Sequence, residues 1–222
     1  MTLKKKILTA SSAALLSLTF AFNAVAVSVP FTDISHITSK DKIISLQERE
    51  YVSGTGNKKF SPDSRINTAQ TIQLLVKAFD LNLDLIRFIK EPKATDYFTK
   101  ADDAAWYANA LITASVNGVE IDKDIEISKD WTREEFTNIL VSTMESHYNL
   151  PMLDIKPTAI KDEDQITVEF SGAIQRALVY GVVKLDAEGN FYPKDKLTRA
   201  EAAEQIYNAL EYFKGHEKVQ AD

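Results

Sequence analysis

Apolar residues recur at helical spacing in six short stretches of this chain, and the stretches come in three pairs. In the fifth stretch, Phe170, Ala173, Ile174 and Ala177 follow one another at three- and four-residue intervals, which places them on one face of a helix. The other stretches with this spacing begin at Ile43, Ile72, Trp106, Phe136 and Ala202. The pattern predicts a mostly α-helical protein built from helix–loop–helix units.

The second helix of each pair begins with the same signal, a capping residue followed three positions later by Glu or Gln. The three signals are Asn67 with Gln70, Thr132 with Glu135, and Thr198 with Glu201. In such a capping box, the side chain of the first residue accepts a hydrogen bond from the backbone N–H of the third helical residue, whose side chain reaches back. Asn and Thr both suit the first position. We expect all six residues to be structural helix caps.

The capping signals recur 65 and then 66 residues apart, which indicates three copies of one module. Phe60 and Pro62 in copy one match Phe191 and Pro193 in copy three, each pair 131 residues apart. The sequence of the middle copy matches the other two less closely. The expected boundaries are copy one in 27–90, copy two in 91–152, copy three in 153–214 and a C-terminal tail in 215–222. About 65 residues is marginal for an independent core, so we expect the copies to pack into one helical body.

Residues 1–26 have the pattern of a secretory signal peptide rather than of a folded segment. Three lysines precede an apolar run, and Ala24-Val25-Ala26 ends it with small residues at the cleavage positions. A retained membrane anchor is the alternative, because the apolar run can just be stretched to the ~20 residues that a bilayer requires. Signal cleavage predicts a secreted protein with no further membrane contact.

The charge of the remaining chain limits its partners. Without residues 1–26 it carries 23 basic and 32 acidic residues, a balance that disfavours nucleic acid as a partner. An anionic ligand would need a local basic site. The sequence has no cysteine, so an exported form depends on a packed core rather than on disulfides.

Several elements in order resemble the S-layer homology module of bacterial cell-surface proteins. They include Phe-Thr-Asp at residues 31–33, Trp106 placed 12 residues before Gly118, and Leu-Thr-Arg-Ala-Glu at residues 197–201. The resemblance extends from residue 31 to about residue 213. It implies that the three modules form a pseudo-threefold helical prism. It also implies binding to a secondary cell wall polymer of Gram-positive bacteria, often one ending in a pyruvylated sugar, through grooves between modules.

The residue after the cap is the first candidate for ligand binding. It is Arg199 in copy three, Arg133 in copy two and Thr68 in copy one. Capping does not need an arginine, and a positive charge in the first helical turn is mildly unfavourable beside the helix dipole. A bidentate contact with a carboxylate would explain it, and a pyruvyl ketal carries that group. The alternatives are a solvated arginine or an ion pair with a neighbouring copy. A groove that depends on Thr68 is expected to be silent.

The other candidate ligand-binding residues are Trp106, Asp33 and Asp162. The family uses the tryptophan of the first helix in its site, although an aromatic residue on a helical stripe is more often part of the core. The two aspartates would accept hydrogen bonds from sugar hydroxyls, or they would cap the following turn.

Nothing in the sequence predicts catalysis, a cofactor or a metal site. The three histidines are scattered, and glycine-rich phosphate loops and nucleophile elbows are absent. Acidic pairs such as Asp102-Asp103 leave weak calcium binding open without supporting it. The leading hypothesis is therefore a non-catalytic protein that binds a secondary cell wall polysaccharide. The alternative is a structural or adaptor surface protein that keeps the fold, has degenerate glycan sites and binds another surface protein.

Overall fold

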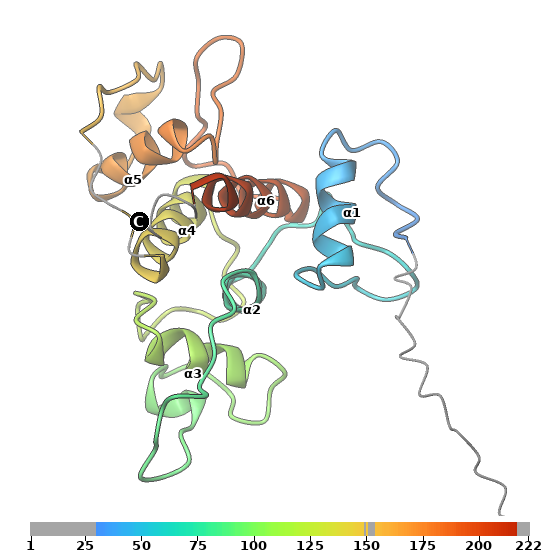
Figure 1. Ribbon diagram of the computed structural model, residues 1–222, viewed down its shortest axis with the longest axis vertical. Coiled ribbons are helices and arrows are strands. Elements are labelled where there is room, and N and C mark those ends of the chain that lie inside the picture. Colours follow the sequence, from blue (N-terminus) through green and yellow to red (C-terminus); the bar gives the residue numbers. More distant parts are fainter. Residues whose placement is uncertain (1–29, 149, 151–153, 217–222) are drawn as a thin grey trace, which may run out of the picture.

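The computed structural model describes residues 30–148, 150 and 154–216. Within these residues it contains six α-helices and two short 3-10 helices (η), and no β-strand, so the predicted mostly α-helical fold class is confirmed (Figure 1). The elements are α1 (Lys40–Glu48), α2 (Thr68–Ala78), η1 (Ala94–Asp96), α3 (Ala108–Val116), α4 (Arg133–His147), η2 (Glu163–Gln165), α5 (Val168–Val179) and α6 (Arg199–His216). The expected signal peptide lies outside the described residues. Helix α6 continues two residues into the expected C-terminal tail.

The three second helices, α2, α4 and α6, contact one another and start from a shared ring of backbone hydrogen bonds. The ring joins the residues directly before the caps. Ile66 N–H donates to the Leu197 carbonyl at 3.1 Å, Leu197 N–H to the Trp131 carbonyl at 2.9 Å, and Trp131 N–H to the Ile66 carbonyl at 3.1 Å. Each copy therefore donates to one neighbour and accepts from the other. A regular threefold prism stays a prediction.

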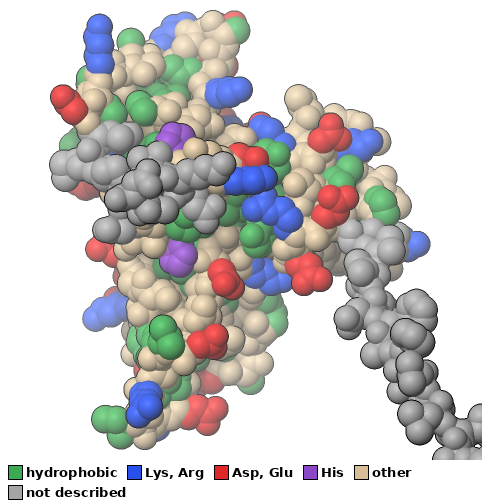
Figure 2. Space-filling view, viewed as in Figure 1, with side chains coloured by type: hydrophobic (Ala, Val, Ile, Leu, Met, Phe, Trp, Pro, Cys, Tyr) green, Lys and Arg blue, Asp and Glu red, His purple; other side chains and the backbone are tan. Residues whose placement is uncertain are grey.

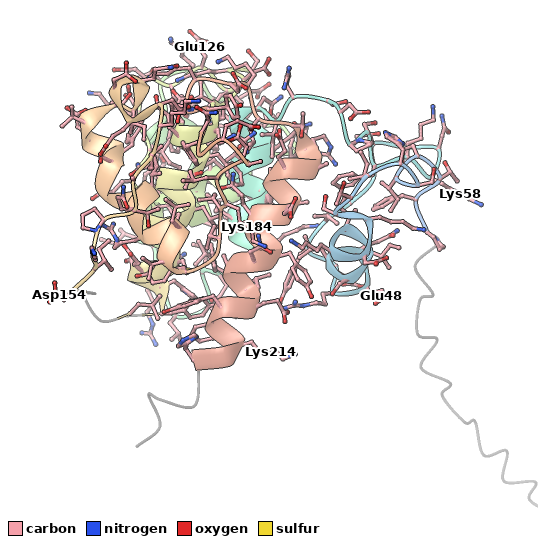
Figure 3. The ribbon with its side chains drawn as sticks, turned by 90° about the horizontal axis from the view of Figure 1, so that it is seen from above. Glu48, Lys58, Glu126, Asp154, Lys184 and Lys214 are labelled. Carbon is pink, nitrogen blue, oxygen red and sulfur yellow. The ribbon has the colours of Figure 1, made fainter. Side chains whose placement is uncertain are left out.

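Each first helix packs mainly on the second helix of a different copy. Helix α3 packs on α2, α5 packs on α4, and α1 packs on α6 (Figure 1). Figure 3 shows the last of these pairs from above, with α1 beside α6. The ion pairs Lys42–Glu204 and Arg49–Glu211 join the two helices at 2.6 and 3.3 Å. The three copies therefore form one structural unit, because the first helix of each copy packs on the second helix of another copy.

The core is one continuous apolar cluster that draws on all three copies. Five phenylalanines are its largest fully buried members: Phe60, Phe79, Phe98, Phe136 and Phe191. Phe60 and Phe191 are equivalent positions of copies one and three, and they lie 1% and 2% exposed. The duplication seen in the sequence is thus a duplication of core positions.

The capping boxes are present at the start of all three second helices. The backbone N–H of the cap donates to the side chain three residues on, from Asn67 to Gln70 (3.3 Å), from Thr132 to Glu135 (2.9 Å) and from Thr198 to Glu201 (2.8 Å). In return, the backbone N–H of Gln70, Glu135 or Glu201 donates to the side chain of its cap residue, at 3.1, 3.4 and 3.2 Å respectively. Because these caps follow the ring directly, they fix where the three helices begin and how the next side chain points.

Acidic and basic side chains are interspersed over the face seen in Figure 2, rather than gathered in one charged area. No helix in the described part of the chain is long and apolar enough to cross a membrane. A binding site for an anionic ligand therefore has to be sought in a local cavity rather than in the overall field.

Candidate functional site

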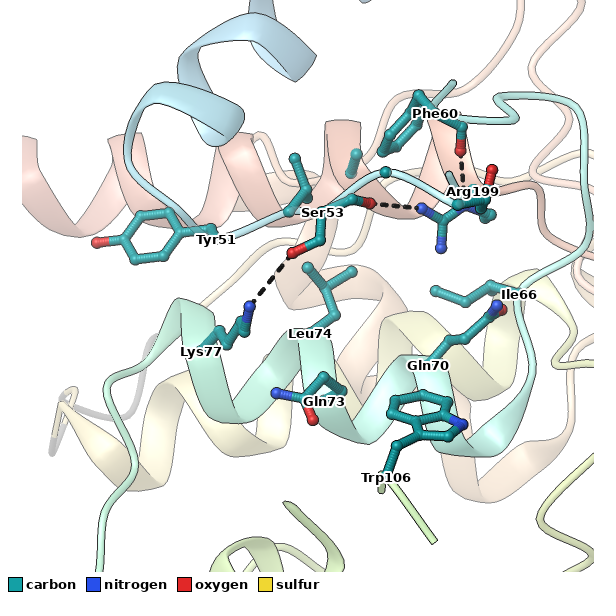
Figure 4. Close-up of a pocket in the computed structure, with 14 residues that line it drawn as sticks. Tyr51, Ser53, Phe60, Ile66, Gln70, Gln73, Leu74, Lys77, Trp106 and Arg199 are labelled. Atoms are coloured by element: carbon teal, nitrogen blue, oxygen red, sulfur yellow. Dashed lines mark hydrogen bonds between the residues drawn. The ribbon is translucent and has the colours of Figure 1, made fainter. Parts of the chain in front are cut away.

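A cavity of about 440 Å³ lies along α2, between the loop that follows α1 and the start of α6. We call it the Arg199 groove. It is lined from all three copies: residues 51–55 and α2 of copy one, Trp106 of copy two and Arg199 of copy three (Figure 4). The structure thus brings together two of the residues that the sequence analysis selected for ligand binding.

Arg199 is held rigidly at one wall of this groove. Its Nε donates to the Phe60 carbonyl at 3.0 Å and its Nη2 donates to the Ser53 carbonyl at 3.1 Å. The guanidinium also lies over the Phe60 ring, 4.8 Å from its centroid. Burial lowers the pKa of Arg199, while the negative charge of Asp33 acts in the opposite direction. The remaining nitrogen, Nη1, makes no hydrogen bond to the described residues and points into the groove (Figure 4).

The loop at residues 53–55 presents the Ser53 carbonyl to Arg199. A Cβ at Gly54 would lie 2.7 Å from the backbone oxygen of Lys59, so any other residue there would displace the loop. Ser53 accepts from Arg199 through its carbonyl and from Lys77 Nζ through its hydroxyl, at 3.4 Å. Arg199 and Lys77 therefore place two positive charges on the groove, one at each side of Ser53.

The polar residues of α2 that line the groove were missed in the sequence analysis. Gln70, Gln73 and Lys77 recur at three- and four-residue intervals on a helix whose other positions are mostly buried. This polar stripe is a usable signal, because it marks the one face of α2 that the core does not cover.

Trp106 is placed differently from the prediction. It was expected on the stripe of the first helix, but α3 begins only at Ala108, and Trp106 lies in the turn before it. Its side chain is 64% exposed rather than part of the core. The indole faces the groove from the side opposite Arg199 (Figure 4). An exposed flat ring opposite a cation suits a ligand that combines a sugar face with a negative charge.

Asp33 and Asp162 hold equivalent loops rather than facing an open cavity. Asp33 accepts hydrogen bonds from the backbone N–H groups of Phe60 and Ser61, at 2.8 and 2.9 Å. Asp162 accepts from Phe191 and Tyr192, at 2.8 and 2.7 Å. Ser61 and Tyr192 both have positive φ, 59° and 58°, so each carboxylate stabilises a left-handed residue. Their contact with a ligand stays a prediction.

The backbone donors also control the ionisation of Asp33. Burial raises the pKa of this carboxyl group, but the N–H groups of Phe60 and Ser61 oppose burial and together hold the pKa below its usual value of 3.8. Asp33 therefore stays ionised at neutral pH and fixes Phe60, whose carbonyl orients Arg199. It acts on the groove through that loop.

A second groove, of about 180 Å³, occupies the equivalent place on α4. We call it the Trp131 groove. Four of its lining residues are the copy-two equivalents of residues that line the Arg199 groove, each 65 positions later in the chain. They are Trp131, Glu135, Asn138 and Ile139, which correspond to Ile66, Gln70, Gln73 and Leu74. Its remaining lining includes Glu120 and Asp122. The equivalent groove is smaller and richer in carboxylates.

Thr68 stands where Arg199 stands in the first groove, and it is fully buried. Its hydroxyl donates to the Glu126 carbonyl at 2.9 Å and accepts from Trp131 Nε1 at 2.9 Å. Thr68 thus puts a neutral, buried side chain where the first groove has a guanidinium, and the expectation that a groove depending on Thr68 is silent stays a prediction. Thr68 therefore has a structural role that was not predicted for the position after the cap, because its hydroxyl links copy one to Glu126 and Trp131 of copy two.

Arg133 makes the ion pair between copies that the sequence analysis left as an alternative. Its Nη2 donates to Glu201 Oε1 at 2.6 Å, and Glu201 is the capping residue of α6. Its Nε is buried and has no partner among the described residues. Next to it, the buried Glu134 accepts from Thr167 N–H at 2.9 Å and pairs with Lys194. Arg133 is thus paired with a carboxylate of the protein, whereas the hydrogen bonds of Arg199 to the described residues go to carbonyl oxygens.

The described residues contain no group of three or more His, Asp or Glu side chains that would hold a metal ion. Asp102 and Asp103, which had left calcium binding open, accept hydrogen bonds from Ala104 and Thr95 backbone N–H groups. The Arg199 groove is lined by two cations, Arg199 and Lys77, by the amides of Gln70 and Gln73, and by the exposed indole of Trp106.

Comparison with known proteins identifies the module. Residues 30–72 and 159–203 match the model of the S-layer homology domain. The chain is similar to three curated bacterial proteins. It is 30% identical to exoglucanase XynX of Acetivibrio thermocellus over 186 residues, 28% to amylopullulanase of Thermoanaerobacterium thermosulfurigenes over 183, and 26% to endoglucanase of Bacillus sp. strain KSM-635 over 190.

The matches cover most of this chain but little of each relative. They include 83%, 82% and 85% of this chain, and 16%, 9% and 19% of the respective relatives. The chain spans less than a fifth of the length of the curated relatives that it matches. What it shares with these three enzymes is one small region of each.

Proposed function

We propose that this chain, which carries S-layer homology domains and so belongs with cell-surface and cell-wall proteins, is a non-catalytic wall-binding protein. Its ligand is an anionic secondary cell wall polysaccharide, with a pyruvylated sugar as the group recognised. The observation that carries the proposal is Arg199, a fixed guanidinium with a free Nη1 in a groove shared by three copies.

The chemistry of the groove supports this ligand class. A carboxylate on a sugar would pair with Arg199, and Lys77 adds a second charge within the same cavity. The amides of Gln70 and Gln73 both donate and accept, as sugar hydroxyls require. Trp106 offers an exposed aromatic face for the apolar side of a sugar ring.

The pairing of Arg133 and the burial of Thr68 limit this activity to one groove. An arginine that already donates a hydrogen bond to the Glu201 carboxylate has less to offer a ligand, because the carboxylate neutralises its charge. We therefore infer that wall binding depends on Arg199 and is largely independent of Arg133.

The test is co-sedimentation of the mature protein with purified sacculi, with and without extraction of the secondary polymer. Wild-type protein should sediment with intact walls and not with extracted walls. Arg199→Ala should weaken binding at least about tenfold, since hydrogen bonds to charged groups contribute about 1.5–3 kcal/mol. Arg133→Ala is the matched control, with a change below about threefold by the same scale.

Two results would contradict the proposal. Failure of the wild-type protein to sediment with intact walls would rule out wall binding. Equal losses in the two arginine variants would rule out the single-groove assignment. Circular dichroism and thermal melting of each variant separate loss of binding from loss of fold.

A second candidate function, binding to another surface protein, is favoured by one observation. In the loop between α2 and η1, Leu85 and Ile89 are 97% and 109% exposed and Phe88 is 37% exposed. Exposed apolar groups of this kind mark interaction surfaces. If protein is the partner, protease treatment of the sacculi should abolish sedimentation, and so should Leu85→Asp combined with Ile89→Asp.

A further inference from the structure

Trp106 forms the wall between two cavities. One is the Arg199 groove, of about 440 Å³, and the other has a volume of about 350 Å³. Both cavities reach the N-terminal turn of α2, where Gln70 lines the first, and Asn67 and Ala69 line the second. The two cavities therefore lie next to each other, with one indole between them.

The indole is available from both cavities because little of the protein covers it. Trp106 is 64% exposed. Its one ring contact among the described residues is with Tyr107, edge to face, with centroids 5.6 Å apart and planes at 78°. Tyr107 itself lines the second cavity. Tyr107 packs against the core, whereas the Trp106 indole is left largely open to both cavities.

The second cavity has polar groups suited to a sugar rather than to an apolar ligand. Lys100 and Glu126 line it and form an ion pair with each other, and Ser128 contributes a hydroxyl. The ion pair has no net charge to offer, but its ammonium group can donate hydrogen bonds to a neutral sugar and its carboxylate can accept them, and the hydroxyl can do both. Ile127 and Ala69 form its apolar floor. The lining is mostly polar over a small apolar floor, which suits a hydroxylated ligand.

We propose that this second cavity, which we call the Lys100 subsite, binds the next sugar of the polymer whose acidic sugar sits at Arg199. The inference rests on the proposed function. It adds that the ligand is an extended glycan of at least two sugar units that crosses Trp106. Recognition then depends on chain length as well as on the terminal charge.

The experiment measures binding as a function of glycan length. Wall polysaccharide is released from sacculi and separated by size, and fragments of one, two and three or more repeats are titrated into the mature protein by calorimetry. The variant Ser128→Trp fills the Lys100 subsite, because Ser128 is exposed and lines that cavity and not the Arg199 groove. Lys100→Ala is a second variant that removes a polar group without adding bulk.

The wild-type protein should bind longer fragments about tenfold more tightly than the shortest fragment that carries the acidic sugar. Ser128→Trp should abolish that gain and change the affinity for the shortest fragment by less than about twofold. Lys100→Ala should reduce the gain in part. If one variant fails to fold, as circular dichroism would reveal, the other still decides the result.

Two results would overturn the Lys100 subsite alone. One is equal affinity of the wild-type protein for all fragments, with binding still lost in Arg199→Ala. The other is a length-dependent gain that persists in both subsite variants. By contrast, failure of every fragment to bind, or binding unaffected by Arg199→Ala, would overturn the proposed function itself.

Discussion

The Arg199 groove and the Trp131 groove use equivalent helix positions, yet they offer a ligand different charges. The first exposes Arg199 and Lys77 in about 440 Å³. The second is lined by Glu120, Asp122 and Glu135, with Lys129 as its cation, in about 180 Å³. Lys129 is itself paired with Glu135 at 2.6 Å. The shared scaffold is therefore compatible with one larger cationic site and one smaller, mostly acidic counterpart.

Two differences between the copies contribute to this contrast. Where copy one has Ile66, copy two has Trp131, and where copy three has Arg199, copy one has Thr68. Trp131 is 5% exposed, and its Nε1 donates to Thr68 at 2.9 Å. The indole fills space near the caps, and the short threonine gives it a partner. A repeated fold thus keeps its ring and its caps while the residues beside them are free to diverge.

The largest effect is expected when the arginine is transferred between grooves. Thr68→Arg should lower the free energy of unfolding by about 3 kcal/mol or more, because a charge would enter a fully buried position and Trp131 would lose its acceptor. It should not create a second wall-binding groove. Urea denaturation and sacculus sedimentation measure the two effects.

The reverse change, Arg199→Thr, is the matched control. It removes two hydrogen bonds to carbonyls and should cost about 1–2 kcal/mol of stability, with loss of wall binding. A Thr68→Arg protein that is as stable as the wild type would contradict the assignment of Thr68 to the core.

Replacing either of the two equivalent aspartates is expected to lower the free energy of unfolding by less than Thr68→Arg does. Asp33→Ala and Asp162→Ala should each cost about 2–3 kcal/mol, since each removes a charged acceptor from two backbone N–H groups. Only Asp33→Ala should also weaken wall binding, because it releases Phe60, whose carbonyl orients Arg199. Thermal melting and sedimentation of the pair separate these outcomes. Equal effects on binding would show that the Arg199 groove does not depend on this loop.

The smallest effect is confined to acid pH. The pKa of Asp33 in the folded protein lies below its ordinary value of 3.8, so the folded state favours the carboxylate. The stability that this carboxylate contributes is present above that value and is lost as the pH falls through the folded pKa. Melting temperatures between about pH 5 and pH 2 should therefore fall less steeply in Asp33→Asn than in the wild type. Parallel curves would contradict the role given to Asp33.

The helices and caps were predictable from the sequence because both depend on residues close together in the chain. The Thr198 and Glu201 pair, for example, needs only one helical turn to form. The stripe of Phe170, Ala173 and Ile174 likewise predicted α5. Trp106 was placed wrongly because an apolar residue just before a helix has the same spacing as one on it.

The residues proposed for ligand binding were predictable only in part. Arg199 was found because a cation in the first turn conflicts with the local helix, so it needed an explanation from outside that helix. Arg133 was selected for the same reason; an ion pair with a neighbouring copy was left as an alternative, but the sequence did not identify Glu201 as the partner. Lys77 and Gln73 were missed because polar residues on a helix are ordinary until the neighbours of that face are known.

The sequence by itself determined that this protein is three copies of one helical unit and where each second helix begins, because periodicity and capping act over a few residues. Only the tertiary structure decided which copy completes which groove. Arg199 lies 139 residues from Phe60 and 93 from Trp106 in the chain. The three residues line one cavity because each copy packs on its neighbours. Whether a cation is free or paired depends on those distant neighbours, since charge and burial are properties of the assembled trio.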